Sequence, residues 1–325
     1  MLTAALLLAG WEWTMHMPGR SYALLLTDQD LTPMERVSRQ RLKEDLLWLT
    51  GERGGARDGS GDATRDRVAY LEGQFRAAGW RVTRLPLPGP GPAATTLEAR
   101  GAGGTLQTAP VVVGAHYDAA PNSPGADANA AAVAVLLELA RLLEPDTAVV
   151  FPLRLVAFAR GAAPWSGTPH QGSRMYLNNL ANPRLVLSLT GMGVYSDLPG
   201  TQHWPGPVGW MLPRQGNFLG FFALAPHRGL LHRVLGEFRQ GGVFPSLGLV
   251  VPTRGWSLPQ DPFQDLHACR ERNLPCVLLS DTGPWRQPHY AGPEDRPEAI
   301  NLAALTLVAR ELARTLQSLV NVQGP

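Results

Sequence analysis

Apolar residues form short runs that alternate with stretches in which they recur every three or four positions. The runs are typical of strands buried in a sheet, and the three-to-four spacing is typical of helices packed along one side. The predicted strands are 80–86, 111–115, 154–158, 185–189, 248–252 and 275–280, and the predicted helices are 130–143, 172–180, 227–239 and 297–320. This alternation predicts an α/β fold, a three-layer α/β/α sandwich with a central, mostly parallel mixed sheet.

A further helix is predicted near the start of the chain, over residues 33–50. Thr32 can cap it, Pro33 suits its first position and Glu35 completes a capping box. Gly51 can end it, because glycine readily adopts the left-handed conformation that follows a helix.

A second helix is predicted over 64–78, because Val68, Leu71 and Phe75 share one face and Gly79 follows as a stop signal. Gly- and Pro-rich loops are predicted at 52–63 and 87–94, with a hairpin at 101–104.

Length and composition suit one large globular domain. The chain has 325 residues, of which 44% are hydrophobic and 17% charged. We expect one domain over 32–320, preceded by a segment, 1–31, with a weak apolar run. No Lys or Arg precedes that run and Glu12 follows it, which makes a poor signal peptide and too short a membrane span. Met15 and Met17 are alternative starts. Because this N-terminus gives little support for export, a cytoplasmic location is slightly favoured, and export stays open.

The net charge limits the kind of partner, and the two cysteines leave their redox state to be decided. The net charge is +2 and Lys43 is the only lysine, so no nucleic-acid or acidic-membrane partner is expected. Cys269 and Cys276 lie seven residues apart. Two buried thiols are the favoured prediction, and a disulfide remains the alternative because it requires neighbouring Cα atoms.

One segment carries the residues of a metal site. The apolar strand 111–113 leads into His116 and Asp118, and a Pro/Gly loop then leads to Asp127 and an Ala/Leu-rich helix. The carboxyl end of a strand is where α/β enzymes place ligands.

The run "VVVGAHYD…PGADANAAAVAVLLELARLL" resembles the M28 family of zinc aminopeptidases. The likeness continues in order through 156–176, 186–205 and 274–302, and it covers residues 33 to about 318. The resemblance implies an aminopeptidase-like α/β/α fold and a pair of zinc ions. Two His, a bridging carboxylate and two further acidic ligands hold these ions, and a separate Glu is the general base.

The resemblance places the metal positions residue by residue. His116 matches the first ligand and Asp118 the residue that orients it. The bridging carboxylate falls on Ala128, directly after Asp127. The remaining positions carry no charged side chain: the base at Gly161, the next ligand at Ala162, the strand-end acid at Thr190 and the last His at Ala291.

Only one of the five ligand positions therefore keeps a metal-binding side chain, and no cofactor is expected. The favoured hypothesis is a catalytically inactive pseudopeptidase that serves as a binding or interaction module for an unknown small molecule or peptide. The alternative is an active metallo-aminopeptidase with relocated zinc ligands; the donors available for it are Asp127, His170, His267 and His289.

A third hypothesis is a metal-free hydrolase that uses Ser166, His170 and Ser173, although the chain has no Gly-x-Ser-x-Gly motif. Under the pseudopeptidase hypothesis, we expect a cleft wider and more neutral than a zinc site, with His116 near Asp118 and Trp165 at the rim. Five side chains should then face one cavity: His116, Ala128, Ala162, Thr190 and Ala291.

Overall fold

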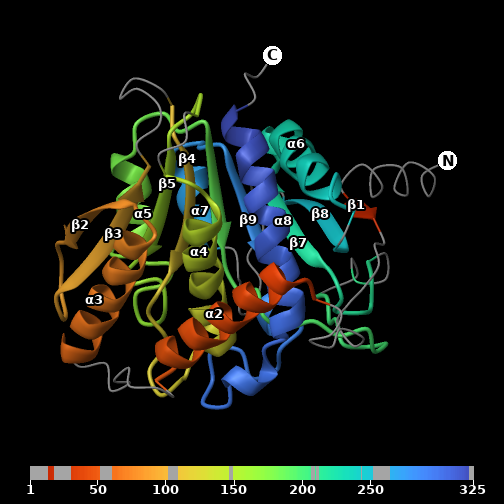
Figure 1. The fold of residues 1–325 in the computed structure, drawn as a ribbon, viewed down its shortest axis with the longest axis horizontal. Helices are drawn as coiled ribbons and strands as arrows, with labels where there is room; N and C mark the ends of the chain where they lie inside the picture. Colours follow the sequence, from red (N-terminus) through yellow and green to blue (C-terminus); the bar gives the residue numbers. More distant parts are fainter. Residues whose placement is uncertain are drawn as a thin grey trace.

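A nine-stranded mixed sheet runs through the molecule, with helices on both faces (Figure 1). The computed structural model describes residues 14–17, 31–51, 61–101, 109–145, 149–205, 209, 212–242, 244–251 and 264–321. The strands are β1 Thr14–Met17, β2 Arg81–Leu87, β3 Ala94–Arg100, β4 Val111–His116, β5 Leu153–Phe158, β6 Leu185–Leu189, β7 Leu219–Leu224, β8 Ser246–Val251 and β9 Cys276–Ser280. This architecture confirms the predicted α/β class.

The parallel strands β5, β4, β6 and β9 are neighbours at the centre of the sheet, whose order is β1-β8-β7-β9-β6-β4-β5-β3-β2. The pairs β2–β3, β3–β5, β7–β9 and β1–β8 are antiparallel, and β7–β8 is parallel. The central strands are buried on both faces, which explains why they read as apolar runs in the sequence.

Alternate residues of each central strand pack on opposite faces of the sheet. Val111 and Val113 join the larger apolar core, whereas Val112 joins the smaller one. Helices α2, α3, α4, α6 and α8 supply the larger core, and α5 and α7 supply the smaller. The helices are α2 Pro33–Leu49, α3 Gly61–Ala77, α4 Ala131–Leu142, α5 Gly172–Asn179, α6 Arg228–Arg239, α7 Gln264–Glu271 and α8 Leu302–Asn321.

The capping box predicted near the start of the chain is present at the N-terminus of α2. The Thr32 side chain accepts a hydrogen bond from the Glu35 amide, and Glu35 accepts one from the Thr32 amide. Helix α3 begins at Gly61, so the predicted loop was wrong for residues 61–63.

Four of the strands and α-helices were not predicted, namely β1, β3, β7 and α7. The expected hairpin at 101–104 lies outside the described residues except for Gly101. A hairpin is instead formed by β2 and β3, whose seven residue pairs run from Arg81–Arg100 to Leu87–Ala94.

Cys269 and Cys276 form a disulfide, so the expectation of two buried thiols was wrong. The turn after α7 brings the helix back against the first residue of β9, and the two Cα atoms lie 6.3 Å apart. The bond ties α7 to the sheet.

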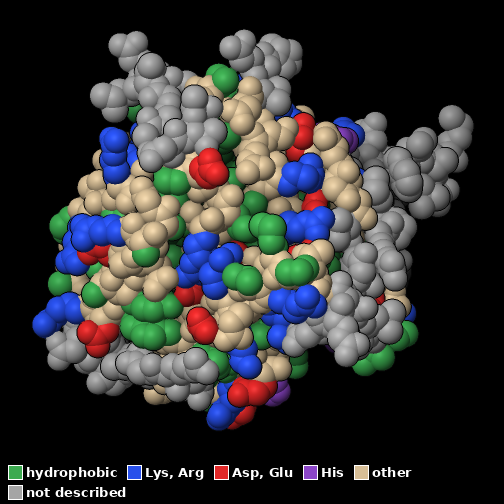
Figure 2. All heavy atoms as spheres, in the orientation of Figure 1, with side chains coloured by type: hydrophobic (Ala, Val, Ile, Leu, Met, Phe, Trp, Pro, Cys, Tyr) green, Lys and Arg blue, Asp and Glu red, His purple; other side chains and the backbone are tan. Residues whose placement is uncertain are grey.

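The face covered by α2, α4 and α8 shows basic side chains scattered among acidic ones (Figure 2). Several form ion pairs there, including Arg41 with Glu138 and Arg141 with Asp45. Within the described part of the chain, no helix is long and apolar enough to cross a membrane.

Candidate functional site

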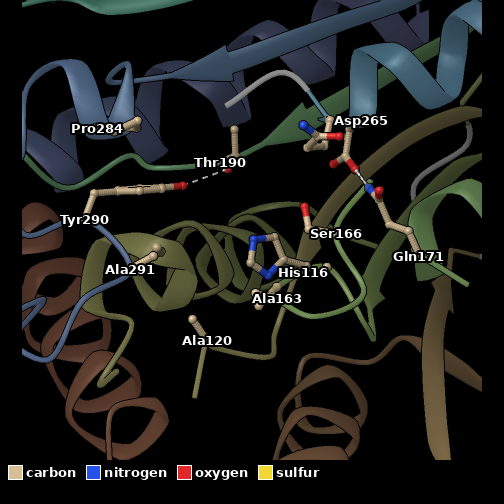
Figure 3. Close-up of a pocket in the computed structure, with 14 residues that line it drawn as sticks. His116, Ala120, Ala163, Ser166, Gln171, Thr190, Asp265, Pro284, Tyr290 and Ala291 are labelled. Carbon is tan, nitrogen blue, oxygen red and sulfur yellow. Dashed lines mark hydrogen bonds between the residues drawn. The ribbon is translucent and has the colours of Figure 1, made fainter. Parts of the chain in front are cut away.

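A cavity of about 400 Å³ lies at the carboxyl ends of the central parallel strands. His116 is the last residue of β4, Gly161 and Ala162 follow β5, and Thr190 follows β6 directly. Ala291 reaches the cavity from the loop after β9 (Figure 3). Parallel strands direct their carboxyl ends to one edge of the sheet, which is why segments far apart in the sequence meet here.

All five expected side chains line this one cavity, together with Gly161; the five are His116, Ala128, Ala162, Thr190 and Ala291. Asp118 lies beside His116 and lines a neighbouring cavity of about 390 Å³. Asp127 is fully buried and does not line the cavity.

The imidazole of His116 is fixed by Asp118. Its Nδ1 lies 3.0 Å from the Asp118 carbonyl oxygen and 3.5 Å from a carboxylate oxygen. Burial lowers the pKa of His116, but the hydrogen bond and charge of Asp118, with a smaller contribution from Asp265, leave it above its ordinary value. The paired Nδ1 leaves Nε2 as the nitrogen not held by Asp118.

The Asp118 carboxylate is also bound by the backbone that follows β5. The Gly161 and Ala162 amides donate to its two oxygens at 2.8 and 2.9 Å. Burial raises the pKa of Asp118, but the combined effect of His116 and these two amides is larger and holds the pKa below its ordinary value. Backbone donors therefore stabilise a carboxylate beside the imidazole.

Gly161 packs directly against His116. A Cβ built on Gly161 would lie 2.2 Å from the His116 Cβ and 2.3 Å from its Cγ. No side chain can occupy position 161 unless the backbone moves, so the contact itself requires glycine.

Asp295, which the sequence analysis missed, holds two walls of the cavity together. Its carboxylate accepts hydrogen bonds from the amides of Asp127 at 2.8 Å, Ala128 at 3.0 Å and Ala291 at 3.1 Å. Asn129 has a similar role: its side-chain amide donates to the carbonyl oxygens at the ends of β4 and β6, at 3.3 and 3.1 Å. Polar side chains thus fix the backbone around small side chains.

Asp127, the residue before Ala128, is fully buried next to the cavity wall. One of its carboxylate oxygens accepts from the Gly193 amide at 2.9 Å. Burial, the charges of Asp281 and Asp295, and a hydrogen bond to Asp281 raise the pKa of Asp127 well above its ordinary value. The side chain is part of the buried support of the site.

Asp265, from α7, is a carboxylate in the cavity that the sequence analysis also missed. It accepts hydrogen bonds from Gln171 at 2.8 Å, Ser173 at 2.5 Å and Ser188. Asp265 was not foreseen because α7 was not predicted, and it adds one carboxylate to a cavity that was expected to be more neutral than a zinc site. The sequence signal was the short "FQDLHAC" segment, whose buried positions are too few to give a helical pattern.

None of the histidines considered as relocated ligands lines the cavity. His289 is exposed, and His170 packs edge-on against Trp165 with ring centroids 6.2 Å apart. Trp165 was expected at the rim but lines the neighbouring cavity, because Arg160 stacks over its ring at 4.9 Å. Ser166 lines the cavity, whereas Ser173 donates to Asp265, so the serine arrangement considered from the sequence is not formed.

The donor set of the cavity does not fit a pair of zinc ions. The described residues that line it offer one imidazole, His116, and one carboxylate, Asp265, which already accepts three hydrogen bonds. A catalytic zinc takes about three protein ligands. Within the described ranges, no group of three or more His, Cys, Asp or Glu side chains is placed to hold a metal ion.

The fold is shared with zinc aminopeptidases and glutaminyl cyclases. BSAP, a zinc aminopeptidase from Bacillus subtilis, superposes with a TM-score of 0.65 at 13% identity, over 88% of this chain and 95% of that one. The glutaminyl cyclase of Porphyromonas gingivalis gives 0.62 at 16% identity, over 87% and 98%.

Sequence comparison agrees with the fold. The model of peptidase family M28 matches residues 97–201, which include His116, Asp118, Ala128, Gly161 and Thr190. The uncharacterized protein YfbL of Escherichia coli K12 is 28% identical over 288 residues, or 84% of this chain and 85% of that protein. The match over residues 97–201 confirms the resemblance to peptidase family M28, and the structural likeness confirms the shared fold.

Proposed function

We propose that this M28 peptidase-like chain is catalytically inactive and that its cavity binds a small molecule or a peptide end without hydrolysing it. One observation supports the proposal: Ala128, Ala162, Thr190 and Ala291, the residues on which the resemblance places four of the five zinc ligands, line a single cavity. Three of these side chains carry no donor atom, and the threonine hydroxyl is a weak, neutral one.

The position of the general base gives separate support. It falls on Gly161, where the contact with His116 leaves no room for a side chain. Loss of a general base typically lowers a rate by about 10²- to 10⁴-fold. Loss of the zinc-bound water that it would activate removes the nucleophile as well.

The cavity nevertheless retains an ordered frame. Asp295, Asn129 and Asp118 hold the surrounding backbone through hydrogen bonds, and the space between them measures about 400 Å³. Small-molecule sites are concave, largely apolar and contain a few fixed polar groups. His116, Asp265, Thr190 and Tyr290 are such groups here, among alanine and proline walls.

Metal content and turnover test the proposal. The purified chain is incubated with zinc, desalted and analysed by elemental spectroscopy, and then assayed with leucine p-nitroanilide. The zinc aminopeptidase from Bacillus subtilis serves as the positive control. We expect neither stoichiometric zinc nor turnover. Two zinc ions per chain together with chelator-sensitive cleavage would overturn the proposal and support relocated ligands.

The variant His116→Ala completes this experiment. If any cleavage observed in the preparation came from a contaminating peptidase, it would be the same in the variant, because nothing but this chain has changed. Cleavage that disappears with His116 would locate an activity in the cavity and contradict the proposal.

A further inference from the structure

A second cavity, of about 390 Å³, lies beside the first, and the loops that follow β4 and β5 line both. We infer that this second cavity binds the carboxylate of a small, largely apolar organic acid, and that Arg160 recognises the carboxylate. The inference does not depend on the proposed function, because Arg160 does not line the first cavity.

Arg160 is a buried cation without an anionic partner. Its side chain lines the second cavity, yet the residue is only 4% exposed. The guanidinium donates hydrogen bonds to three carbonyl oxygens of the loop between β2 and β3, those of Pro88 and Pro90 at 3.0 Å and of Pro92 at 3.2 Å. Across the described ranges, no Asp or Glu forms an ion pair with it. Because charged side chains are seldom this buried without a partner of opposite charge, the position favours an anionic ligand.

The guanidinium keeps donors for such a ligand. It has five N–H groups, and the three carbonyls accept from one on Nη1 and two on Nη2. The Nε–H and one Nη1–H therefore have no protein acceptor. Nε is not among the polar atoms that are fully buried without a partner, so a ligand can reach it. The ring of Trp165, 4.9 Å from the guanidinium carbon, and the three carbonyls hold these donors in one orientation, which lowers the entropic cost of binding.

The walls of the second cavity suit the apolar part of an organic acid. Its volume lies in the range of small-molecule sites, which combine apolar walls with a few polar groups. The apolar walls come from the rings of Tyr117 and Trp165 and from prolines and alanines of the surrounding loops. Arg67 and Thr64, from α3, add donors on another side of the cavity.

Asp118 limits the charge that the ligand can carry. It lines the same cavity, and the Gly161 and Ala162 amides, which donate to its two oxygens, stabilise the ionised form. A doubly charged phosphate would be repelled by this carboxylate, whereas a neutral ligand would leave Arg160 without an anion. A singly charged carboxylate satisfies both conditions.

Calorimetric titration of the purified full chain at neutral pH tests the inference with benzoate, benzamide and inorganic phosphate. Benzamide has nearly the shape of benzoate but no charge. We expect benzoate to bind, and benzamide to bind about tenfold to hundredfold more weakly, because a hydrogen bond to a charged acceptor is replaced by one to a neutral acceptor. Phosphate should bind more weakly than benzoate.

Arg160→Gln should reduce the affinity for benzoate to that for benzamide, while Arg272→Gln should leave both affinities unchanged. Arg272 is a matched control because it also donates to three carbonyl oxygens, those of Leu177, Asn178 and Leu180, and lines neither cavity. The variants therefore separate the loss of a carbonyl-binding arginine from the loss of a ligand-binding one.

A second measurement locates the ligand in the unchanged protein. The indole N–H resonance of Trp165, assigned by its absence in Trp165→Phe, should shift when benzoate is added. This experiment decides the location of the site even if Arg160→Gln does not fold.

Four results would overturn the inference. Two concern affinity: equal binding of benzoate and benzamide, and no binding of benzoate at roughly 10 mM. The third is tighter binding of phosphate than of benzoate, which would contradict the assignment of a singly charged carboxylate. The fourth is benzoate binding that leaves the Trp165 resonance or the Arg160→Gln affinity unchanged, which would place the ligand elsewhere. Zinc content and peptide cleavage concern the first cavity and test the proposed function separately.

Discussion

Gly161→Ala should strongly destabilise the protein although it adds a single methyl group. The new Cβ would lie 2.2, 2.3 and 2.9 Å from the Cβ, Cγ and Cδ2 atoms of His116. Ordinary contacts between such atoms begin near 3.4 Å, so the backbone or the imidazole must move by about 1 Å or more.

The size of the effect follows from what would have to move. Overpacking a filled site typically costs about 1–3 kcal/mol. Here the displaced backbone also carries the two amides that bind Asp118, at 2.8 and 2.9 Å. Weakening these charged hydrogen bonds adds about 1 kcal/mol or more. We therefore expect a loss of about 3 kcal/mol, and a fall in Tm of roughly 4–5 °C for a chain of this size.

Thermal and urea unfolding of Gly161→Ala measure this, with Gly236→Ala as the matched control. Gly236 lies within α6, and a Cβ there meets nothing within 4 Å, so its substitution should be neutral or slightly stabilising. A double-mutant cycle with His116→Gly identifies the contact, because Gly161→Ala should cost less once His116 has no side chain. A loss below about 0.5 kcal/mol for Gly161→Ala alone would refute the reasoning.

Three other substitutions test the support of the cavity. Asp127→Asn should stabilise the protein at pH 7. The pKa of Asp127 is raised in the folded state, so the wild-type protein loses stability as the pH rises from the ordinary aspartate range through the folded-state pKa. Asparagine does not ionise, so the variant avoids this loss. The difference should disappear near pH 4, and urea titrations across pH would contradict this if the curves stayed parallel. Asp295→Asn should lower the free energy of unfolding by about 1–3 kcal/mol. Both carboxylate oxygens accept from backbone amides, and in the variant one of these amides would face an NH₂ group instead of an acceptor. An unchanged urea midpoint would contradict this prediction. Cys276→Ser should cost about 2 kcal/mol through the lost short loop to Cys269, and a wild-type Tm unaffected by reductant would contradict that estimate.

The parts of the fold predicted from the sequence were those with a local physical cause. The capping box at Thr32 and Glu35 depends on four consecutive residues, and the central strands on runs buried on both faces. The helix α7 was missed because eight residues give too few turns to show a helical pattern.

The candidate site, too, could be predicted only in part. The motif spacing placed His116, Ala128 and Thr190 correctly on one cavity, since each follows from its position at a strand end or an adjoining loop. Asp265 and Asp295 could not be predicted, because they act through partners that lie 77–94 and 4–168 residues away in the chain. The disulfide was misjudged for a different reason: its cysteines are seven residues apart, and the unpredicted turn between α7 and β9 brings their Cα atoms to 6.3 Å.

The close contact between Gly161 and His116 also limits the directions in which this chain can change. On the proposed register, a return to hydrolysis would need a glutamate at 161, yet any side chain there first disrupts the packing that holds the imidazole. A single replacement would give a less stable protein that still lacks the acidic groups at positions 128 and 190. Several substitutions would have to arrive together before any gain in rate, so a stepwise route back to catalysis passes through variants worse than either end point. Backbone packing, rather than the missing side chains alone, makes the loss difficult to reverse.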